Sequence, residues 1–210
     1  MGILLGILSI VIGYLLGSIP SAYLMGRLRK GIDIRNLDSG NMGAGAVIRQ
    51  VGVWEGVLVG LIDIAKGSAA ILIARALGVA EPWVLAAGFG ALLGHNFPVF
   101  VGFKGGSGTA TIIGIFLILT PVAMGIALVI IAIPILTTRN FAFAVFIGLF
   151  LLPLLICLLC VLLFGGSLML VWYSLVMDAF MLGRNLPVLK RAWPKMGKSN
   201  TAASHRPKLQ

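Results

Sequence analysis

Charged side chains are scarce in this 210-residue chain. Asp, Glu, Lys and Arg together make up 10% of it, whereas soluble domains carry about 25%. Apolar residues make up 60% of the sequence, and the mean hydropathy is +1.10. The composition therefore excludes an ordinary soluble domain and predicts an all-α polytopic membrane protein. We expect a single transmembrane domain over residues 1–195.

Acidic residues are fewest of all. Six Asp and Glu stand against 16 Lys and Arg, a formal net charge of +10. Seven of the 16 basic residues lie from Arg184 onward, where no acid occurs. Such a tail is typical of the cytoplasmic side, where it rests against anionic lipid headgroups. We expect residues 196–210 to be a mobile, basic C-terminal tail, and no nucleic-acid partner, because there is no soluble basic domain.

Lys and Arg are also missing from residues 1–26. A secretory signal peptide begins with a basic region and has a shorter apolar stretch. We therefore expect the apolar segment 3–24 to be a retained membrane span.

Cysteine and histidine are nearly absent, with two of each. Cys157 and Cys160 have the spacing of a redox or metal site, but their Leu and Ile neighbours favour inert packing thiols. His205 lies in the tail, far in sequence from His95, so we predict no metal site and no cofactor. There is also no Gly-x-Ser-x-Gly nucleophile elbow and no plausible Ser-His-Asp set.

Long apolar segments dominate what remains. A spanning helix needs about 20 residues, so segment 109–120, which ends before Pro121, predicts a short, broken fourth helix. If 109–137 is one bent helix the chain crosses six times, and if it is a hairpin it crosses seven times. Seven crossings with the N-terminus outside put the main basic groups and the C-terminus on the cytoplasmic side, as the positive-inside rule favours. The apolar segments are 3–24, 53–77, 82–101, 109–120, 121–137, 140–164 and 167–183.

Two glycine-rich basic segments, 35–49 and 94–111, are the strongest candidates for a site. Glycines free backbone N–H groups to point at one anion, and a nearby cation adds charge. Each segment alone could be a simple turn, but two at the same depth predict a phosphate- or carboxylate-binding floor at the inner membrane surface. The candidate residues are Ser39, Asn41, Gly43 and Arg49 in the first segment, and Lys104, Gly105, Gly106 and Gly108 in the second.

Polar residues inside or beside the spans extend this floor. Asp63 and Lys66 share one helix face, so they could form an ion pair, or Lys66 could reach toward the cytoplasmic end. His95, next to Asn96, could be a general base or could orient the following loop through a backbone carbonyl. Arg139 could belong to the site or extend to the headgroups. A cationic floor beside acyl chains suits a substrate with a phosphate head and a fatty tail.

Several runs of residues, in order along nearly the whole chain, resemble the bacterial acyl-phosphate:glycerol-3-phosphate acyltransferases, the PlsY family. The longest is Gly-His-Asn-Phe-Pro-Val-Phe-Val-Gly-Phe-Lys-Gly-Gly at 94–106. The shorter ones are Gly-Ser-Ile-Pro-Ser-Ala-Tyr-Leu at 17–24, Gly-Ile-Asp-Ile-Arg at 31–35, Ser-Gly-Asn-Met-Gly-Ala at 39–44, Asp-Ile-Ala-Lys-Gly at 63–67 and Thr-Arg at 138–139.

The resemblance implies a multi-pass protein of the bacterial inner membrane with its site facing the cytoplasm. The implied reaction transfers a fatty acyl group from acyl phosphate to the 1-hydroxyl of glycerol 3-phosphate, giving lysophosphatidic acid for phospholipid biosynthesis, with membrane lipids around the protein. Neither a metal nor a covalent acyl-enzyme is implied. The catalytic residues carried over by position are Ser39, Lys104 and Asn185. The substrate- or phosphate-binding residues are Asn41, Gly43, Arg49, Lys66, His95, Asn96, Gly105, Gly106, Gly108 and Arg139.

The chain departs from the family pattern at five positions. Gly45 and Ala46 replace a Thr-Asn pair, Ser107 replaces a lysine, Ala142 stands at a hydroxyl position and Leu182 at a histidine position. These changes leave open an alternative function, a catalytically impaired paralogue that binds phospholipid precursors or phosphate without turnover. A small transporter is a third possibility, which we rank last because the outer half of the spans is dry.

Overall fold

The structure is a computed structural model that describes residues 1–37, 42–138, 151–163, 165 and 167–184. Throughout these ranges every regular element is helical. The elements are α1 (Gly2–Gly17), α2 (Ser21–Lys30), the 3₁₀ turn η1 (Ile34–Asn36), α3 (Ala44–Gln50), α4 (Val53–Ala76), α5 (Glu81–Asn96), the 3₁₀ turn η2 (Val99–Val101), α6 (Thr109–Leu119), α7 (Pro121–Thr138) and the π-helical η3 (Cys157–Leu163). Residues 151–156 and 168–184 are also α-helical.

The first apolar segment is broken, which its composition alone did not predict. Helix α1 ends at Gly17 and α2 begins at Ser21, because Pro20 lacks a backbone N–H and restricts the residue before it. Helix α2 then continues to Lys30, beyond the apolar segment 3–24, so Arg27 lies in its last turn. Basic side chains there interact favourably with the helix dipole.

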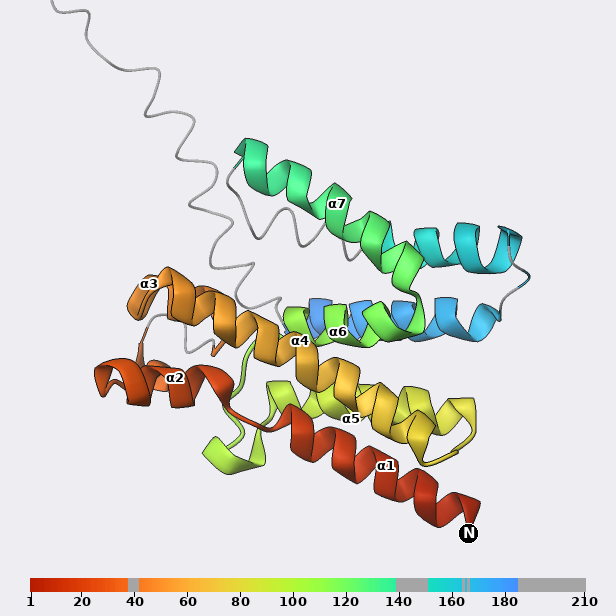
Figure 1. Ribbon diagram of the computed structural model, residues 1–210, viewed down its shortest axis with the longest axis horizontal. Helices are drawn as coiled ribbons and strands as arrows, with labels where there is room; N and C mark the ends of the chain where they lie inside the picture. Colours follow the sequence, from red (N-terminus) through yellow and green to blue (C-terminus); the bar gives the residue numbers. More distant parts are fainter. Residues whose placement is uncertain (38–41, 139–150, 164, 166, 185–210) are drawn as a thin grey trace, which may run out of the picture.

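Helices α1 and α5 pack along a seam of small residues (Figure 1). A side chain at Gly13 would collide with the Ala87 carbonyl, and one at Gly17 would collide with Ala91. From the other side, Gly90 faces the backbone of Ile10. In lipid, close approach through small residues replaces the hydrophobic effect as the force that associates helices.

The chain reverses direction between α6 and α7, so segment 109–137 is two helices (Figure 1). Helix α6 has 11 residues, about 16 Å of helix, which is shorter than an ordinary membrane-spanning helix of about 20 residues. It packs on α4, where Gly114 lies against the Ile64 carbonyl and Ser68 Oγ donates to the Gly114 carbonyl at 2.9 Å. The prediction of a short helix ending before Pro121 is confirmed.

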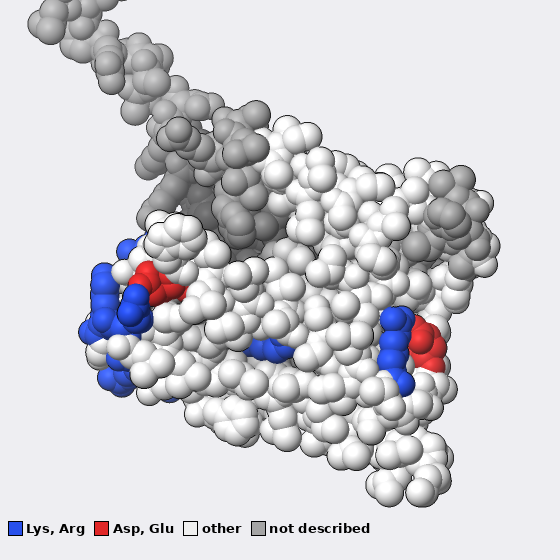
Figure 2. All heavy atoms as spheres, viewed as in Figure 1, with Lys and Arg blue, Asp and Glu red and all other residues white. Residues whose placement is uncertain are grey.

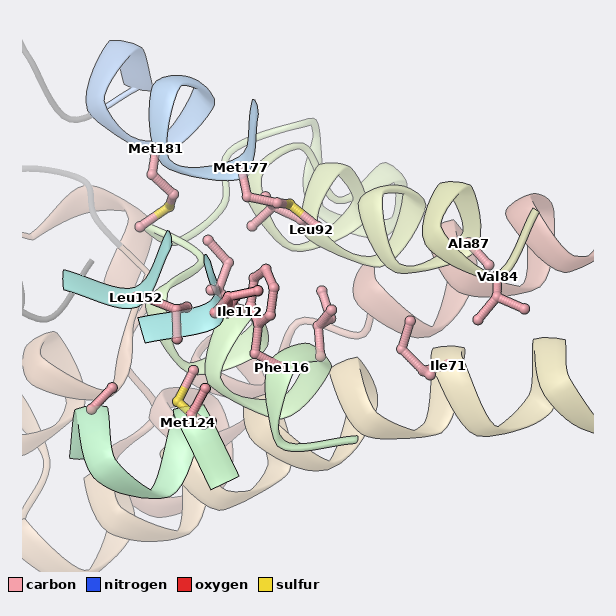
Figure 3. Close-up of a cluster of buried hydrophobic side chains, with 14 of the residues drawn as sticks. Ile71, Val84, Ala87, Leu92, Ile112, Phe116, Met124, Leu152, Met177 and Met181 are labelled. Atoms are coloured by element: carbon pink, nitrogen blue, oxygen red, sulfur yellow. The ribbon is translucent and has the colours of Figure 1, made fainter. Parts of the chain in front are cut away.

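The larger apolar core lies around α6. Figure 3 shows Ile112 and Phe116 at its centre, with Leu92 and Met177 on one side and Met124 on the other. A second apolar cluster lies between α2, α3 and the adjoining part of α4. Its buried members are Ala22, Ile34, Met42, Ala46, Val47, Val59 and Val101.

Within the described ranges, three helical segments are long and apolar enough to cross a membrane. They are Gly2–Lys30, Val53–Ala76 and Glu81–Val101, and Thr109–Leu119 and Pro121–Ile133 are shorter apolar helices. The basic side chains gather at the end formed by α2 and α3, and a smaller charged pair marks the opposite end of α4 (Figure 2). That second pair is Arg75 with Glu81, at 3.8 Å. This protein is therefore helical and membrane-embedded, with its cations concentrated at one end.

Candidate active site

A small pocket, partly open to solvent, lies at the cation-rich end. The break before α2 forms one wall, and the segment after α5 forms the other. Its polar and backbone lining comes from Ser21, Tyr23, Met42, Lys66, His95, Gly105 and Gly106. The pocket thus gathers residues of four separate sequence runs, 17–24, 39–44, 63–67 and 94–106, into one place.

Lys66 is the cation inside this pocket. Its side chain is 5% exposed and its ammonium lies 2.9 Å from Asp63 Oδ1. A second bond runs from Lys66 Nζ to the carbonyl of Ile19, at 3.0 Å. The Ile19 carbonyl can accept this bond because the helix breaks at Pro20 and the carbonyl has no partner within a helix. The break between α1 and α2 therefore provides an acceptor for the buried ammonium in place of water.

Asp63 is the centre of a buried polar network. Its carboxylate accepts a 2.6 Å hydrogen bond from Ser21 Oγ and forms the ion pair with Lys66. His95 Nδ1 lies 3.7 Å from the same carboxylate oxygen and has no hydrogen-bond partner among the residues that the structure describes. The ion pair is the alternative that the structure favours for Asp63 and Lys66, since an unpaired charge at this depth is costly.

The loop after α5 packs directly on His95. The backbone N–H of Gly106 donates to the His95 carbonyl at 3.2 Å. A side chain at Gly105 would begin 2.5 Å from the Asn96 carbonyl oxygen, and one at Gly106 would collide with His95 Nε2. Only glycine fits at either position, because the loop backbone touches the helix end. The main-chain carbonyl of His95 therefore binds this loop, and the role of its imidazole stays a prediction.

The two glycine-rich segments meet at this pocket. The N–H of Met42, in the first segment, donates to the Gly105 carbonyl at 3.4 Å. Met42 and Gly105 both line the pocket. The segment that carries Arg49 and the segment that carries Lys104 are thus in direct contact, at one end of the molecule.

Arg49 and Lys104, the two cations predicted to bind phosphate, are exposed, whereas Lys66 is buried. Lys104 follows two residues with left-handed backbone, Gly102 (φ 71°) and Phe103 (φ 59°). Arg49 lies in the last turn of α3, and its guanidinium reaches back to within 3.6 Å of where a Gly45 side chain would begin. Gly45 stands where the family pattern has a threonine, and a threonine side chain at this position would lie next to the Arg49 guanidinium.

Other expected residues lie near the pocket without lining it. Asn96 is buried, and its amide donates to the Leu92 carbonyl at 2.9 Å. Gly108 has φ 89°, and a side chain there would begin 2.8 Å from the Asn96 amide nitrogen. Gly43 caps the start of α3. Ser107 Oγ lies 3.4 Å from the Thr109 hydroxyl, and Leu182 is 42% exposed.

Four expected site residues fall outside the described residues. They are Ser39, Asn41, Arg139 and Asn185, and the departure at Ala142 also falls there. Their predicted roles stay predictions.

Two pocket residues were not singled out from the sequence. Ser21 anchors Asp63, and Tyr23 lies under two guanidinium groups, at 5.6 Å from Arg27 and 4.8 Å from Arg35. The sequence feature that could have indicated them is Pro20, because both residues lie in the first turn of the helix that begins after it.

Ion pairs join the basic side chains of α2 and η1 to nearby acids. Asp33 accepts from Arg35 Nη2 at 2.6 Å and pairs with Arg27 at 3.4 Å. The hydrogen bonds from Arg35 hold the pKa of Asp33 at about 2, below its ordinary value of 3.8. Arg29 pairs with Glu55 at 2.9 Å. Over the residues that the structure describes, no group of three or more His, Cys, Asp or Glu could hold a metal ion.

This arrangement can be compared with known proteins. A family model described as glycerol-3-phosphate acyltransferase matches residues 7–195. Glycerol-3-phosphate acyltransferase 1 of Dehalococcoides mccartyi is 44% identical over 155 residues, which cover 71% of this chain and 74% of that protein. The glycerol-3-phosphate acyltransferase of Anaeromyxobacter sp. (strain K) is 49% identical over 122 residues, 56% of this chain and 61% of that one.

Solved structures agree with the sequence comparison. The crystal structure of PlsY (YgiH), an integral membrane glycerol 3-phosphate acyltransferase, in its glycerol 3-phosphate form superposes with a TM-score of 0.82 and 30% identity. The superposition covers 90% of this chain and 92% of that one. Because the family model spans nearly the whole chain and the fold agrees, this chain belongs to the glycerol-3-phosphate acyltransferase family.

Proposed function

We propose that this protein transfers a fatty acyl group from acyl phosphate to the 1-hydroxyl of glycerol 3-phosphate, forming lysophosphatidic acid for phospholipid biosynthesis. One observation carries the proposal beyond family membership. The contact between Met42 and Gly105 joins the two glycine-rich cationic segments at one pocket. A reaction between two phosphorylated substrates needs two anion-binding segments in reach of each other.

The pocket's surroundings suit both ends of the donor. Phosphate groups would be held by Arg49, Lys104 and the backbone N–H of Gly105, with Lys66 behind them. Gly106 would shape this loop, because its own N–H donates to the His95 carbonyl. The acyl chain would lie among the lipid-facing helices, whose outer side chains are apolar. In this proposal Ser39, Lys104 and Asn185 are the catalytic residues, and Asn41, Gly43, His95, Asn96, Gly108 and Arg139 complete the polar site.

The transfer is an ester-forming displacement at the acyl carbonyl. The 1-hydroxyl oxygen of glycerol 3-phosphate bonds to the carbonyl carbon, and the bond from that carbon to the phosphate oxygen breaks. The hydroxyl proton leaves with the released phosphate. The protein's contribution is to position two anions that repel each other and to stabilise the negative charge that develops on the carbonyl and phosphate oxygens.

The proposal includes a topology of seven membrane crossings. The N-terminus lies outside, the C-terminus lies inside, and the site faces the cytoplasm of a bacterial inner membrane. The gathering of cations around α2 and α3 supports this orientation, because basic groups are retained on the cytoplasmic side. The hairpin of α6 and α7 supports an odd number of crossings in place of six.

The test is product formation by purified protein in lipid. Wild-type chain supplied with acyl phosphate and glycerol 3-phosphate is expected to form lysophosphatidic acid. Lys104→Ala is expected to lower kcat/KM by about a hundredfold or more, because a preorganised cation at developing charge is lost. Lys30→Ala is the matched control, since Lys30 is another exposed cation at this end but donates to the Gln50 carbonyl.

Two outcomes would contradict the proposal. Folded wild-type protein that binds glycerol 3-phosphate and forms no product would favour the binding-only alternative. Equal losses in Lys104→Ala and Lys30→Ala would show that general positive charge, and not Lys104, supports the reaction.

A further inference from the structure

The turn that leads to Lys104 is held by few contacts. Phe103 has a left-handed backbone (φ 59°), which non-glycine residues rarely adopt and which persists only when neighbouring contacts impose it. Packing does not impose it, because Phe103 is 57% exposed and open space surrounds the place where a Gly102 side chain would begin. Hydrogen bonds must therefore hold the turn.

Two of those bonds bracket the turn. The N–H of Phe103 donates to the Pro98 carbonyl at 2.9 Å, which closes η2 on itself. The second bond comes from far away in the sequence, because Arg35 Nη1 donates to the Val101 carbonyl at 3.1 Å. Arg35 is thus a tie between the first glycine-rich segment and the turn before Lys104.

Arg35 is itself held rigidly. Its Nε and Nη2 bond to Asp33 at 3.0 and 2.6 Å, and its guanidinium lies 4.8 Å from the centre of the Tyr23 ring. Beside it, Ile34 is 1% exposed and belongs to the same apolar cluster as Val101. Because the guanidinium is planar and Asp33 holds its Nε and Nη2, the position of Nη1 is fixed, and Nη1 donates to the Val101 carbonyl.

We propose that Arg35 is a positioning residue for acyl transfer, which fixes the Gly102–Phe103 turn through the Val101 carbonyl and so holds Lys104 beside the pocket. This inference rests on the proposed function for its role in turnover. Arg35 itself need not touch a substrate. The Asp33 carboxylate and the Tyr23 ring serve to orient Arg35.

Arg27 provides a matched comparison. It shares the two orienting contacts of Arg35, pairing with Asp33 at 3.4 Å and lying 5.6 Å from the Tyr23 ring. Its other hydrogen bond goes to the carbonyl of Gly31, the residue that caps its own helix. Changing Arg27 therefore tests the shared contacts, and changing Arg35 tests the bond to Val101.

The experiment compares Arg35→Lys and Arg27→Lys in the full chain in lipid nanodiscs. Both substitutions keep the positive charge, but a lysine at position 35 cannot hold Asp33 and reach Val101 at once. Arg35→Lys is expected to speed amide hydrogen exchange over residues 99–104 and to raise KM for glycerol 3-phosphate, each by about tenfold, with a smaller change in kcat. Arg27→Lys is expected to leave both measurements near the wild-type values.

The outcomes separate cleanly. Equal effects of the two substitutions, or unchanged exchange in Arg35→Lys, would overturn the proposal. Arg35→Gln is measured in parallel with the same expectations, so that poor folding of one variant does not decide the question. If wild-type protein forms no lysophosphatidic acid, the proposed function and the role in turnover both fail, and exchange still shows whether Arg35 holds the turn.

Discussion

Lys66 and Asp63 form an ion pair of 2.9 Å on one face of α4, and their side chains are only 5% and 1% exposed. Each of the two ions has a further hydrogen-bond partner. Ser21 donates to Asp63 and the Ile19 carbonyl accepts from Lys66, both from the break between α1 and α2. A buried charge pair is tolerated when further hydrogen bonds satisfy it, so this pair also fixes the break against α4.

Removing one charge of this pair should destabilise the protein strongly. Lys66→Met leaves the Asp63 carboxylate buried without a counter-charge, and we expect a loss of about 3–5 kcal/mol in the free energy of unfolding. Thermal unfolding in detergent, followed by tryptophan fluorescence, measures the change. The double variant Asp63→Asn/Lys66→Met should recover much of the loss, because it removes both charges and keeps an acceptor for Ser21. Equal stability of the single and double variants would contradict this account.

The glycine at position 105 should be irreplaceable for steric reasons. In Gly105→Ala the added methyl would begin 2.5 Å from the Asn96 carbonyl oxygen, so the loop must move away from His95, and we expect a cost of about 1–3 kcal/mol with most activity lost. The matched control is Gly125→Ala in α7, where nothing lies within 4 Å of the new methyl. Full activity of Gly105→Ala in a lysophosphatidic acid assay would refute the close contact.

The seam between α1 and α5 predicts a similar sensitivity away from the site. Gly17→Val would place a branched side chain against Ala91, with its first carbon 2.7 Å from the Ala91 carbonyl carbon. We expect a lower unfolding temperature in detergent, from an overpacking cost of about 1–3 kcal/mol. Leu15→Val serves as the control, since Leu15 is 43% exposed on the same helix. A Gly17→Val protein as stable as the control would exclude the packed seam.

The Asp33 ion pair predicts a defined acid dependence. Its folded-state pKa is about 2, below the ordinary 3.8, chiefly because Arg35 hydrogen-bonds to the carboxylate. A depressed pKa stabilises the fold above pH 3.8, and this contribution disappears as the pH falls through about 2. Unfolding temperatures of Asp33→Asn should therefore fall less steeply than those of wild type over that acid range, and should be parallel to them near neutral pH. Identical slopes in acid would contradict the assignment.

The amino-acid sequence determined the class of the protein and the residue types of its site. Few charges and long apolar runs predict a membrane protein. Its spans are expected to be helical, because backbone N–H and C=O groups in lipid must form their hydrogen bonds within the same segment. Proline determined where α6 ends, as predicted from Thr120-Pro121. The glycines around Lys104 also predicted an anion-binding loop, and this role stays a prediction. These features are local, so a sequence pattern carries them.

Only the tertiary structure decided which of these features act together. The contact of Met42 with Gly105, and the ties of Asp63 to Ser21 and of Arg35 to Val101, join positions 42 to 66 residues apart. No periodicity encodes such pairs, because they depend on how helices cross and on where a carbonyl is left without a partner in its own helix. The same reason explains why His95 could be read from sequence as either a base or an anchor, whereas its carbonyl bond to Gly106 appears only in the folded chain.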